Sequence, residues 1–134
     1  MKFIILTGIQ GSGKSEFYIR NFAESDIVRI NLDTLKSRIK EDTLINKCII
    51  KNKSLIIDNT NVTVLQRKKY IDIAKENNYK IISYYIKCEI DLAIARNKLR
   101  EEHARVPEFV IYTTYKNLVI PSKEEGFDTL YIIK

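Results

Sequence analysis

Five short apolar runs are spread along the chain, and longer amphipathic or polar segments separate them. The runs cover residues 3–6, 28–31, 54–58, 80–88 and 129–133. Each is bounded by polar or turn-forming residues and is rich in Ile, Leu, Val or Tyr, which predicts five strands. The third run is continuously apolar and closes with an acid, which is typical of a strand buried in a parallel sheet.

The intervening segments carry helical patterns. We predict helices over residues 14–24, 34–51, 63–77, 91–102 and 107–115, with a loop over residues 121–126. Thr63 can cap the third helix, and Pro107 can open the last. Strand and helix therefore alternate along the whole chain. This alternation predicts an α/β fold of three layers, with a mainly parallel five-stranded sheet between helices.

Composition sets limits on this picture. The chain has 134 residues, which suits one domain over residues 1–134. Cys48 and Cys88 lie far apart without metal-ligand spacing, so we expect reduced thiols and a cytoplasmic, reducing setting. We expect no secretory signal and no membrane span. The net charge of +6 fits a polyanionic partner, but a lysine-rich composition typical of an AT-rich genome explains it equally well.

The segment Gly8-Ile-Gln-Gly-Ser-Gly-Lys-Ser15 matches the pattern G-x-x-x-x-G-K-[ST]. A predicted strand precedes it and a predicted helix follows, which is the context of a phosphate-binding loop rather than of a chance match. The glycines can take positive φ and leave room for backbone N–H groups to surround phosphate oxygens. The nucleotide-binding residues predicted in this loop are Gly8, Gln10, Gly11, Ser12, Gly13, Lys14 and Ser15.

Lys14 can reach the β- and γ-phosphates of a nucleoside triphosphate, and the Ser15 hydroxyl can bind Mg²⁺. A second metal-binding candidate is Asp58, which ends the third predicted strand; an ordinary turn acid is the alternative. We therefore expect ATP, or another nucleoside triphosphate, together with Mg²⁺.

Several polar residues follow predicted strands. In parallel α/β folds ligands bind at the carboxyl ends of the strands, so these residues share one edge of the sheet. Asp33 is our candidate general base, although it can equally cap the helix predicted from Thr34. The turn Asn59-Thr60-Asn61 can donate hydrogen bonds to an acceptor, and Lys36, one turn after Asp33, can face an acceptor groove. A plain turn and a charged helix face are the respective alternatives.

Arginines follow the fourth predicted strand. Arg96, Arg100 and Arg105 lie in a segment, residues 96–106, that can close over a triphosphate as a lid and neutralise transition-state charge. A solvated helix face is the alternative, because Lys98 and glutamates are interleaved.

Taken together, these motifs resemble the 5′-hydroxyl kinase domain of phage and animal polynucleotide kinases. The resemblance rests on four stretches besides the phosphate loop, and it covers nearly the whole chain. They are Ile30-Asn-Leu-Asp-Thr-Leu35, Ile57-Asp-Asn-Thr-Asn61, Arg96-Asn-Lys-Leu-Arg100 followed by Arg105-Val-Pro107, and Pro121-Ser-Lys-Glu-Glu-Gly-Phe127. The combination is far more specific than the phosphate loop alone.

The resemblance implies a role for each matching position. Asp33 falls on the base that takes the proton from the 5′-hydroxyl, Arg100 on the lid arginine, and Lys36 on an arginine that clamps the acceptor's 3′-phosphate. Leu32 and Lys36 depart from the family's arginines, and lysine lacks the bidentate fork of arginine. No phosphatase motif occurs, so we expect the kinase half alone.

The sequence thus predicts a kinase that transfers the γ-phosphate of ATP to 5′-hydroxyl ends of DNA or RNA. Two alternatives remain: a kinase of a small metabolite or nucleoside, and a module that binds or hydrolyses ATP without transfer. The choice between DNA and RNA, the oligomeric state and the pathway, whether nucleic acid repair or another, do not follow from the sequence.

Overall fold

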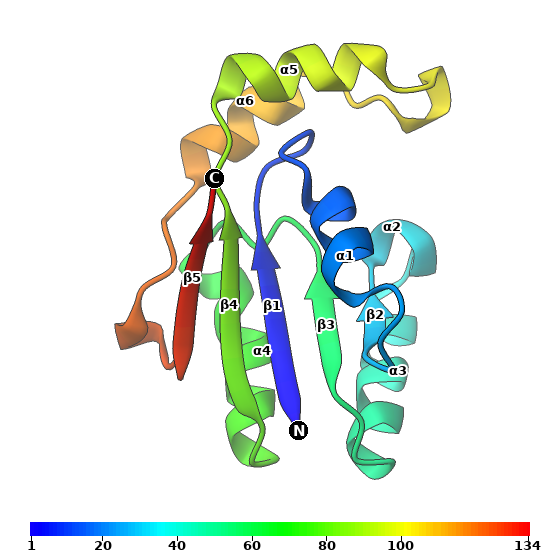
Figure 1. Cartoon of the computed structure of the whole chain (residues 1–134), viewed down its shortest axis with the longest axis vertical. Coiled ribbons are helices and arrows are strands. Elements are labelled where there is room, and N and C mark those ends of the chain that lie inside the picture. The colour runs from blue at the N-terminus through cyan, green and yellow to red at the C-terminus, as the bar shows by residue number, and fades with distance from the viewer.

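Five parallel strands form the centre of the computed structural model, which describes residues 1–134. They are β1 (Lys2–Thr7), β2 (Val28–Ile30), β3 (Leu55–Asp58), β4 (Lys80–Ile86) and β5 (Thr129–Ile133). Their order across the sheet is β2-β3-β1-β4-β5, and all neighbouring strands run parallel (Figure 1). All five predicted strands are confirmed, and β1, which leads into the glycine loop, is the central one.

Helices cover both faces of the sheet, as predicted. α1 (Lys14–Phe22) lies on one face, and α3 (Arg38–Ile50) and α4 (Val64–Glu76) lie on the other (Figure 1). The side chains of β1 alternate between the two layers: Phe3 and Ile5 join the core beneath α3 and α4, while Ile4 and Leu6 pack on the α1 side. Burial of each such side chain contributes roughly 1.5–3 kcal/mol, so this one strand anchors both layers.

Two further helices lie across the carboxyl ends of the strands rather than along the sheet (Figure 1). They are α5 (Ile90–Leu99) and α6 (Glu108–Asn117), and a 3₁₀ helix, Glu102–Ala104, lies between them. A small apolar cluster, which includes Ile9 of the glycine loop and Ala93 of α5, joins them to the end of the sheet. Helix α5 therefore covers the edge of the sheet at which we expect ligands to bind.

The long helix predicted over residues 34–51 is wrong. The structure has two helices there, α2 (Leu32–Leu35) and α3, separated at Lys36, whose φ is 58°. The Lys36 N–H bonds the Leu32 carbonyl and closes α2, and the Ser37 hydroxyl accepts from the Lys40 N–H and starts α3. Local capping hydrogen bonds thus override the helical periodicity.

The helix predicted over residues 91–102 is also too long, because α5 ends at Leu99 and Arg100 has extended backbone. A second 3₁₀ helix, Lys123–Glu125, lies within the predicted loop before β5. Cys48 is buried in the core and Cys88 is partly buried, and both are free thiols. None of the helices has the length and apolar character needed to cross a membrane.

Candidate active site

The glycine loop connects β1 to α1 at the centre of the sheet. Gly11 and Gly13 have φ of 78° and 100°, in the left-handed region that favours glycine, whereas Gly8 does not have positive φ. Gly13 starts α1 without a side-chain cap, so the first N–H groups of α1 remain available to an anion.

Space, rather than conformation, accounts for Gly8, which corrects the expectation of positive φ there. A Cβ at Gly8 would lie 2.7 Å from the Ser12 Oγ. A Cβ at Gly11 would lie only 2.4 Å from the carbonyl oxygen of Ala93 in α5. Because that oxygen belongs to the backbone and cannot easily move, the loop and α5 pack this closely only when residue 11 is glycine.

Lys14 is folded back onto the loop. Its Nζ donates to the carbonyl oxygens of Gly8, at 3.0 Å, and Ile9, at 3.2 Å. The pKa of Lys14 is lowered to about 8, first by burial and further by Arg100, while Asp58 and Asp33 raise it. Three other predicted site residues therefore act electrostatically on Lys14.

The same residues line one cavity of about 780 Å³ at the carboxyl ends of the strands. It is lined by Gln10, Lys14, Ser15, Asn31, Asp33, Asp58, Asn59, Thr60, Arg100, Glu101, His103, Ala104, Arg105 and Val106. A smaller cavity of about 220 Å³ surrounds the loop itself, and Ser12, Arg96 and Arg100 are on its wall. The structure thus brings together the phosphate loop, both candidate carboxylates and the arginine segment.

Asp58 is buried, and its Oδ2 accepts from the Nε of Arg29 at 2.7 Å. Sequence reasoning missed Arg29, because a lone arginine in a short strand gives no sign of its partner on β3. Asp58 and Ser15 line the same cavity, and the second carboxylate oxygen of Asp58 has no bonded partner in the protein. The Ser15 hydroxyl and this free oxygen of Asp58 together fit Mg²⁺, which takes few protein ligands and completes its shell with water and phosphate.

Asp33 lies in the first turn of α2, where it lines both the large cavity and a second one of about 430 Å³. Its carboxylate makes no hydrogen bond or ion pair within the protein. The alternative that Asp33 caps the helix is wrong, because Asn31 is the cap and accepts from the Thr34 N–H at 3.2 Å. Asp33 is therefore free to accept a proton from a ligand at the junction of the two cavities.

The second cavity is the candidate acceptor pocket. It is lined by Gln10, Leu32, Asp33, Arg38, Asn59, Thr60, Asn61, Leu65, Gln66, Lys69, Tyr70 and Val106. Arg38 and Lys69 supply its positive charge, whereas Lys36 is not on its wall and instead closes α2. The break between α2 and α3 accounts for this difference, because it turns the chain between Asp33 and Arg38.

The turn after β3 is less exposed to a ligand than predicted. The Asn61 side chain is buried and donates to the Leu6 carbonyl at 2.8 Å, and the Asn59 amide accepts from the Leu32 N–H at 3.0 Å. Both amides are thus committed to the protein. Thr60 lines both cavities, and only its carbonyl is bonded, to the N–H of Gly8 at 3.0 Å.

The arginine segment lies over the loop. Arg96 donates to the Ser12 carbonyl at 3.1 Å, and the Nε of Arg105 donates to the Arg100 carbonyl at 2.7 Å. Asn97, which the sequence did not single out, is buried and bonds both the N–H and the carbonyl of Val106. This side chain fixes the far end of the segment.

A parallel sheet of this order, with a glycine loop between β1 and α1 and arginines above it, defines a P-loop nucleotide-binding domain of the kinase type. The family model described as an AAA domain matches residues 3–118, and the chain belongs to that family. A sugar kinase from Janibacter sp. HTCC2649 has the same fold, with a TM-score of 0.72 at 13% identity over 99% of this chain and 84% of that one.

Two curated relatives are similar in sequence. The chain is 34% identical to a bifunctional polynucleotide phosphatase/kinase of Schizosaccharomyces pombe, over 94% of its own length. It is 36% identical, over 96% of its length, to an Acanthamoeba polyphaga mimivirus protein with the same bifunctional name. The chain spans about a third, 32%, of the length of each of these relatives.

Proposed function

We propose that this protein is an ATP-dependent kinase that transfers the γ-phosphoryl group to the 5′-hydroxyl end of DNA or RNA. One observation carries the proposal: two cavities meet at the uncommitted carboxylate of Asp33. One cavity contains the residues that we propose bind a triphosphate, and the other has two cations at its wall. Such an arrangement suits a donor and an anionic acceptor that react at their junction.

In the proposed reaction, Asp33 accepts the proton of the acceptor hydroxyl as its oxygen attacks the γ-phosphorus. The bond from that phosphorus to the bridging oxygen of ADP breaks, and the charge collects on ADP. Lys14 and Arg100 stabilise this charge, and backbone N–H groups of the loop hold the phosphates. Mg²⁺ at Ser15 and Asp58 would supply further charge neutralisation.

The acceptor is proposed from charge. Arg38 and Lys69 line the acceptor pocket and have side chains that are 59% and 40% exposed. Both pair with Glu41, and Lys69 also pairs with Asp42 at 2.9 Å, so each would bind a phosphate through its remaining N–H groups. The names of both curated relatives refer to polynucleotides, which supports a nucleic acid acceptor. A small phosphorylated metabolite is the second candidate, because about 430 Å³ lies within the usual range of small-molecule sites, roughly 300–1,000 Å³.

The test is transfer of labelled γ-phosphate from ATP, with Mg²⁺, to matched DNA and RNA oligonucleotides that end in a 5′-hydroxyl. Identical oligonucleotides with a 5′-phosphate serve as the blank acceptors. We expect label only on the 5′-hydroxyl strands, and the ratio of DNA to RNA labelling gives the preference.

Absence of label from all strands, while ATP is bound, would contradict the proposed acceptor. A panel of small phosphorylated metabolites that carry a free hydroxyl would then test the second candidate. ATP turnover that no acceptor changes would instead favour the module that binds or hydrolyses ATP without transfer.

A further inference from the structure

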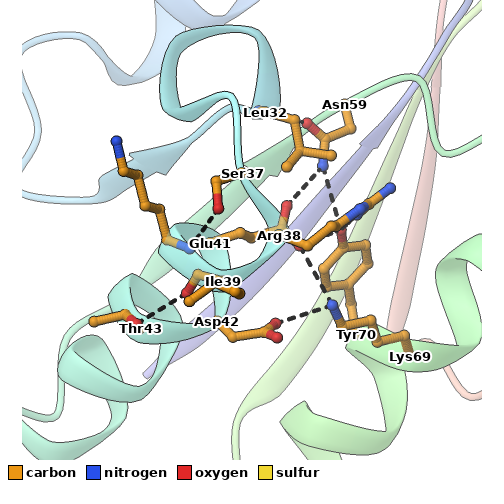
Figure 2. Close-up of polar contacts among 11 residues, drawn as sticks. Leu32, Ser37, Arg38, Ile39, Glu41, Asp42, Thr43, Asn59, Lys69 and Tyr70 are labelled. Atoms are coloured by element: carbon orange, nitrogen blue, oxygen red, sulfur yellow. Dashed lines mark hydrogen bonds and ion pairs between the residues drawn. The ribbon is translucent and has the colours of Figure 1, made fainter.

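A buried carboxylate lies behind the acceptor pocket. Glu41 of α3 has no exposed surface, yet it contacts three polar side chains from other elements of the structure (Figure 2). Its Oε1 accepts from the Tyr70 hydroxyl at 2.9 Å and contacts the Nζ of Lys69 at 3.5 Å, and its Oε2 accepts from the Nδ2 of Asn59 at 3.2 Å. Within α3, Arg38 approaches Oε1 at 3.2 Å.

The Asn59 amide is held at both ends: its NH₂ group donates to Glu41 and, at 3.3 Å, to the Tyr70 hydroxyl, and its Oδ1 accepts from the Leu32 N–H. A carboxylate accepts hydrogen bonds and never donates, so the NH₂ group of Asn59 must face Glu41. The carbonyl end, Oδ1, therefore faces the opposite way and accepts from the Leu32 N–H at 3.0 Å. A flipped Asn59 would set its NH₂ group against the Leu32 N–H, so the charge of Glu41 strengthens an orientation that Leu32 also requires. With a neutral amide at position 41 the charge-assisted bond is lost, and Asn59 and its bond to Leu32 are held less firmly.

Leu32 opens α2 and directly precedes Asp33. This helix has only four residues, and the chain turns again at Lys36, so its hydrogen bonds alone do little to hold it, although Leu35 packs against the core. Its first residue is instead held by the side chain of Asn59, and its cap Asn31 donates to the Asp58 carbonyl at 2.8 Å. The position of Asp33 thus depends on the turn after β3.

We propose that Glu41 is a positioning residue: through Asn59 and the Leu32 N–H, it holds the Asp33 carboxylate at the junction of the two cavities. The proposal rests on the proposed function in that it assigns Asp33 the role of base. Removing the charge of one partner from a buried ion cluster also lowers stability, so an effect of Glu41 on geometry has to be separated from an effect on stability.

The test compares Glu41→Gln with a control on the same helix. Ile45 is one turn further along α3 and is buried in the apolar core, where it can make no hydrogen bond to the network. Ile45→Val and Ile45→Ala are both made, and the unfolding midpoint of each is compared with that of Glu41→Gln. The variant whose midpoint is closer to that of Glu41→Gln serves as the control. A structural defect alone would then affect both proteins equally.

We expect Glu41→Gln to lower kcat for phosphoryl transfer between about tenfold and 10²-fold, because a displacement of about 1 Å from the reacting geometry has an effect of that order. The Kd for ATP should stay within about twofold, since Glu41 touches none of the donor residues. Asn59→Ala should give a similar loss, and the double variant should lose no more than the larger single loss, because both substitutions act through one chain of contacts.

A second readout does not need an acceptor. Hydrogen exchange at the Leu32 amide, followed by NMR, should be about tenfold or more faster in Glu41→Gln and unchanged in the Ile45 control. Equal kcat values for Glu41→Gln and the control, or an unchanged Leu32 exchange rate, would overturn the inference. If the wild-type protein labels no nucleic acid, the proposed function fails, and the Leu32 exchange rate alone then decides whether Glu41 positions this turn.

Discussion

The donor and acceptor sides of the site are built in different ways. The core of the donor side is one continuous segment, residues 8–15, to which Asp58, Arg96 and Arg100 are added, and the fit of this segment depends chiefly on backbone groups and on glycines without side chains. The acceptor side is assembled from α2, α3, α4 and the turn after β3, and its contacts are hydrogen bonds between side chains. The donor site thus depends on the small space left around its glycines, whereas the acceptor site depends on the charge and orientation of its side chains.

This difference predicts different outcomes of substitution. On the donor side, an added methyl group is the informative change, because little room is left around the loop. On the acceptor side, a change of charge at constant shape is the informative one. The four predictions below use these contrasts, in order of decreasing effect.

Asp33→Asn has the largest expected effect, because Asp33 is the only residue proposed to act on the acceptor's proton. We expect kcat to fall about 10²–10⁴-fold, with the Kd for ATP nearly unchanged. Single-turnover transfer from labelled ATP measures the first quantity, and binding of a fluorescent nucleotide the second. Asp72→Asn, which alters an exposed pair with Lys68 on α4, is the matched control and should retain wild-type turnover.

Gly11→Ala and Gly13→Ala compare two glycines of positive φ. Each alanine would be strained by about 1–2 kcal/mol in the left-handed region. At Gly11 the new Cβ would also meet the Ala93 carbonyl at 2.4 Å, whereas at Gly13 it would meet only the end of the Arg96 side chain, at 3.3 Å. We expect a loss of stability above about 3 kcal/mol for Gly11→Ala and about 1–2 kcal/mol for Gly13→Ala.

Urea unfolding, followed by fluorescence or circular dichroism, gives both values. Equal losses for the two variants would show that the contact between the loop and α5 is not tight in solution.

The double substitution Arg38→Ala and Lys69→Ala removes the two cations of the acceptor pocket. We expect KM for the oligonucleotide to rise between about tenfold and 10²-fold, and its dependence on salt to weaken, because about two phosphate contacts are lost. The Kd for ATP should not change. Lys68→Ala, an exposed lysine next to Lys69 that pairs with Asp72, is the matched control; an equal rise in KM there would indicate general charge attraction only.

The last prediction concerns pH. Because the pKa of Lys14 is lowered to about 8, the free protein loses this charge as pH rises through about 8, whereas phosphate binding favours the charged form. ATP affinity should therefore be insensitive to this lysine below about pH 8 and fall by up to about tenfold per pH unit above it. Isothermal titration between pH 7 and pH 9.5 measures this, and Lys14→Met should abolish the dependence.

Local signals explain which parts of the fold could be predicted. The strands, the phosphate loop and the capping of α4 by Thr63 each depend on a few neighbouring residues, and the structure confirms them. The break at Lys36 also depends on neighbouring residues, but Ser37 was not recognised as a cap because the surrounding residues fit a continuous helical pattern. A hydroxyl residue flanked by charged ones fits both a helix surface and a cap, and only the turn of the chain decides between them.

Long-range contacts explain which parts of the site could not be predicted. Glu41 in a charged helix reads as a surface residue, yet it is fully buried because partners arrive from α4 and from the turn after β3. Arg29 with Asp58 and Arg67 with Glu125 are 29 and 58 residues apart. The roles of the predicted site residues remain predictions, although the structure places most of them around one pair of cavities.

Hydrogen bonds join the ends of strands β1 and β3 where the two cavities meet. Gly8 donates its N–H to the Thr60 carbonyl, the Asn61 amide donates to the Leu6 carbonyl, and the Thr7 hydroxyl donates to the Asn61 carbonyl. If donor and acceptor bind as proposed, the spacing between them is set by this rigid pair when the chain folds. The entropy lost in aligning the two reactants would then be lost when the chain folds and the ligands bind. Little would remain to be lost in the transfer step, so its activation entropy should be small.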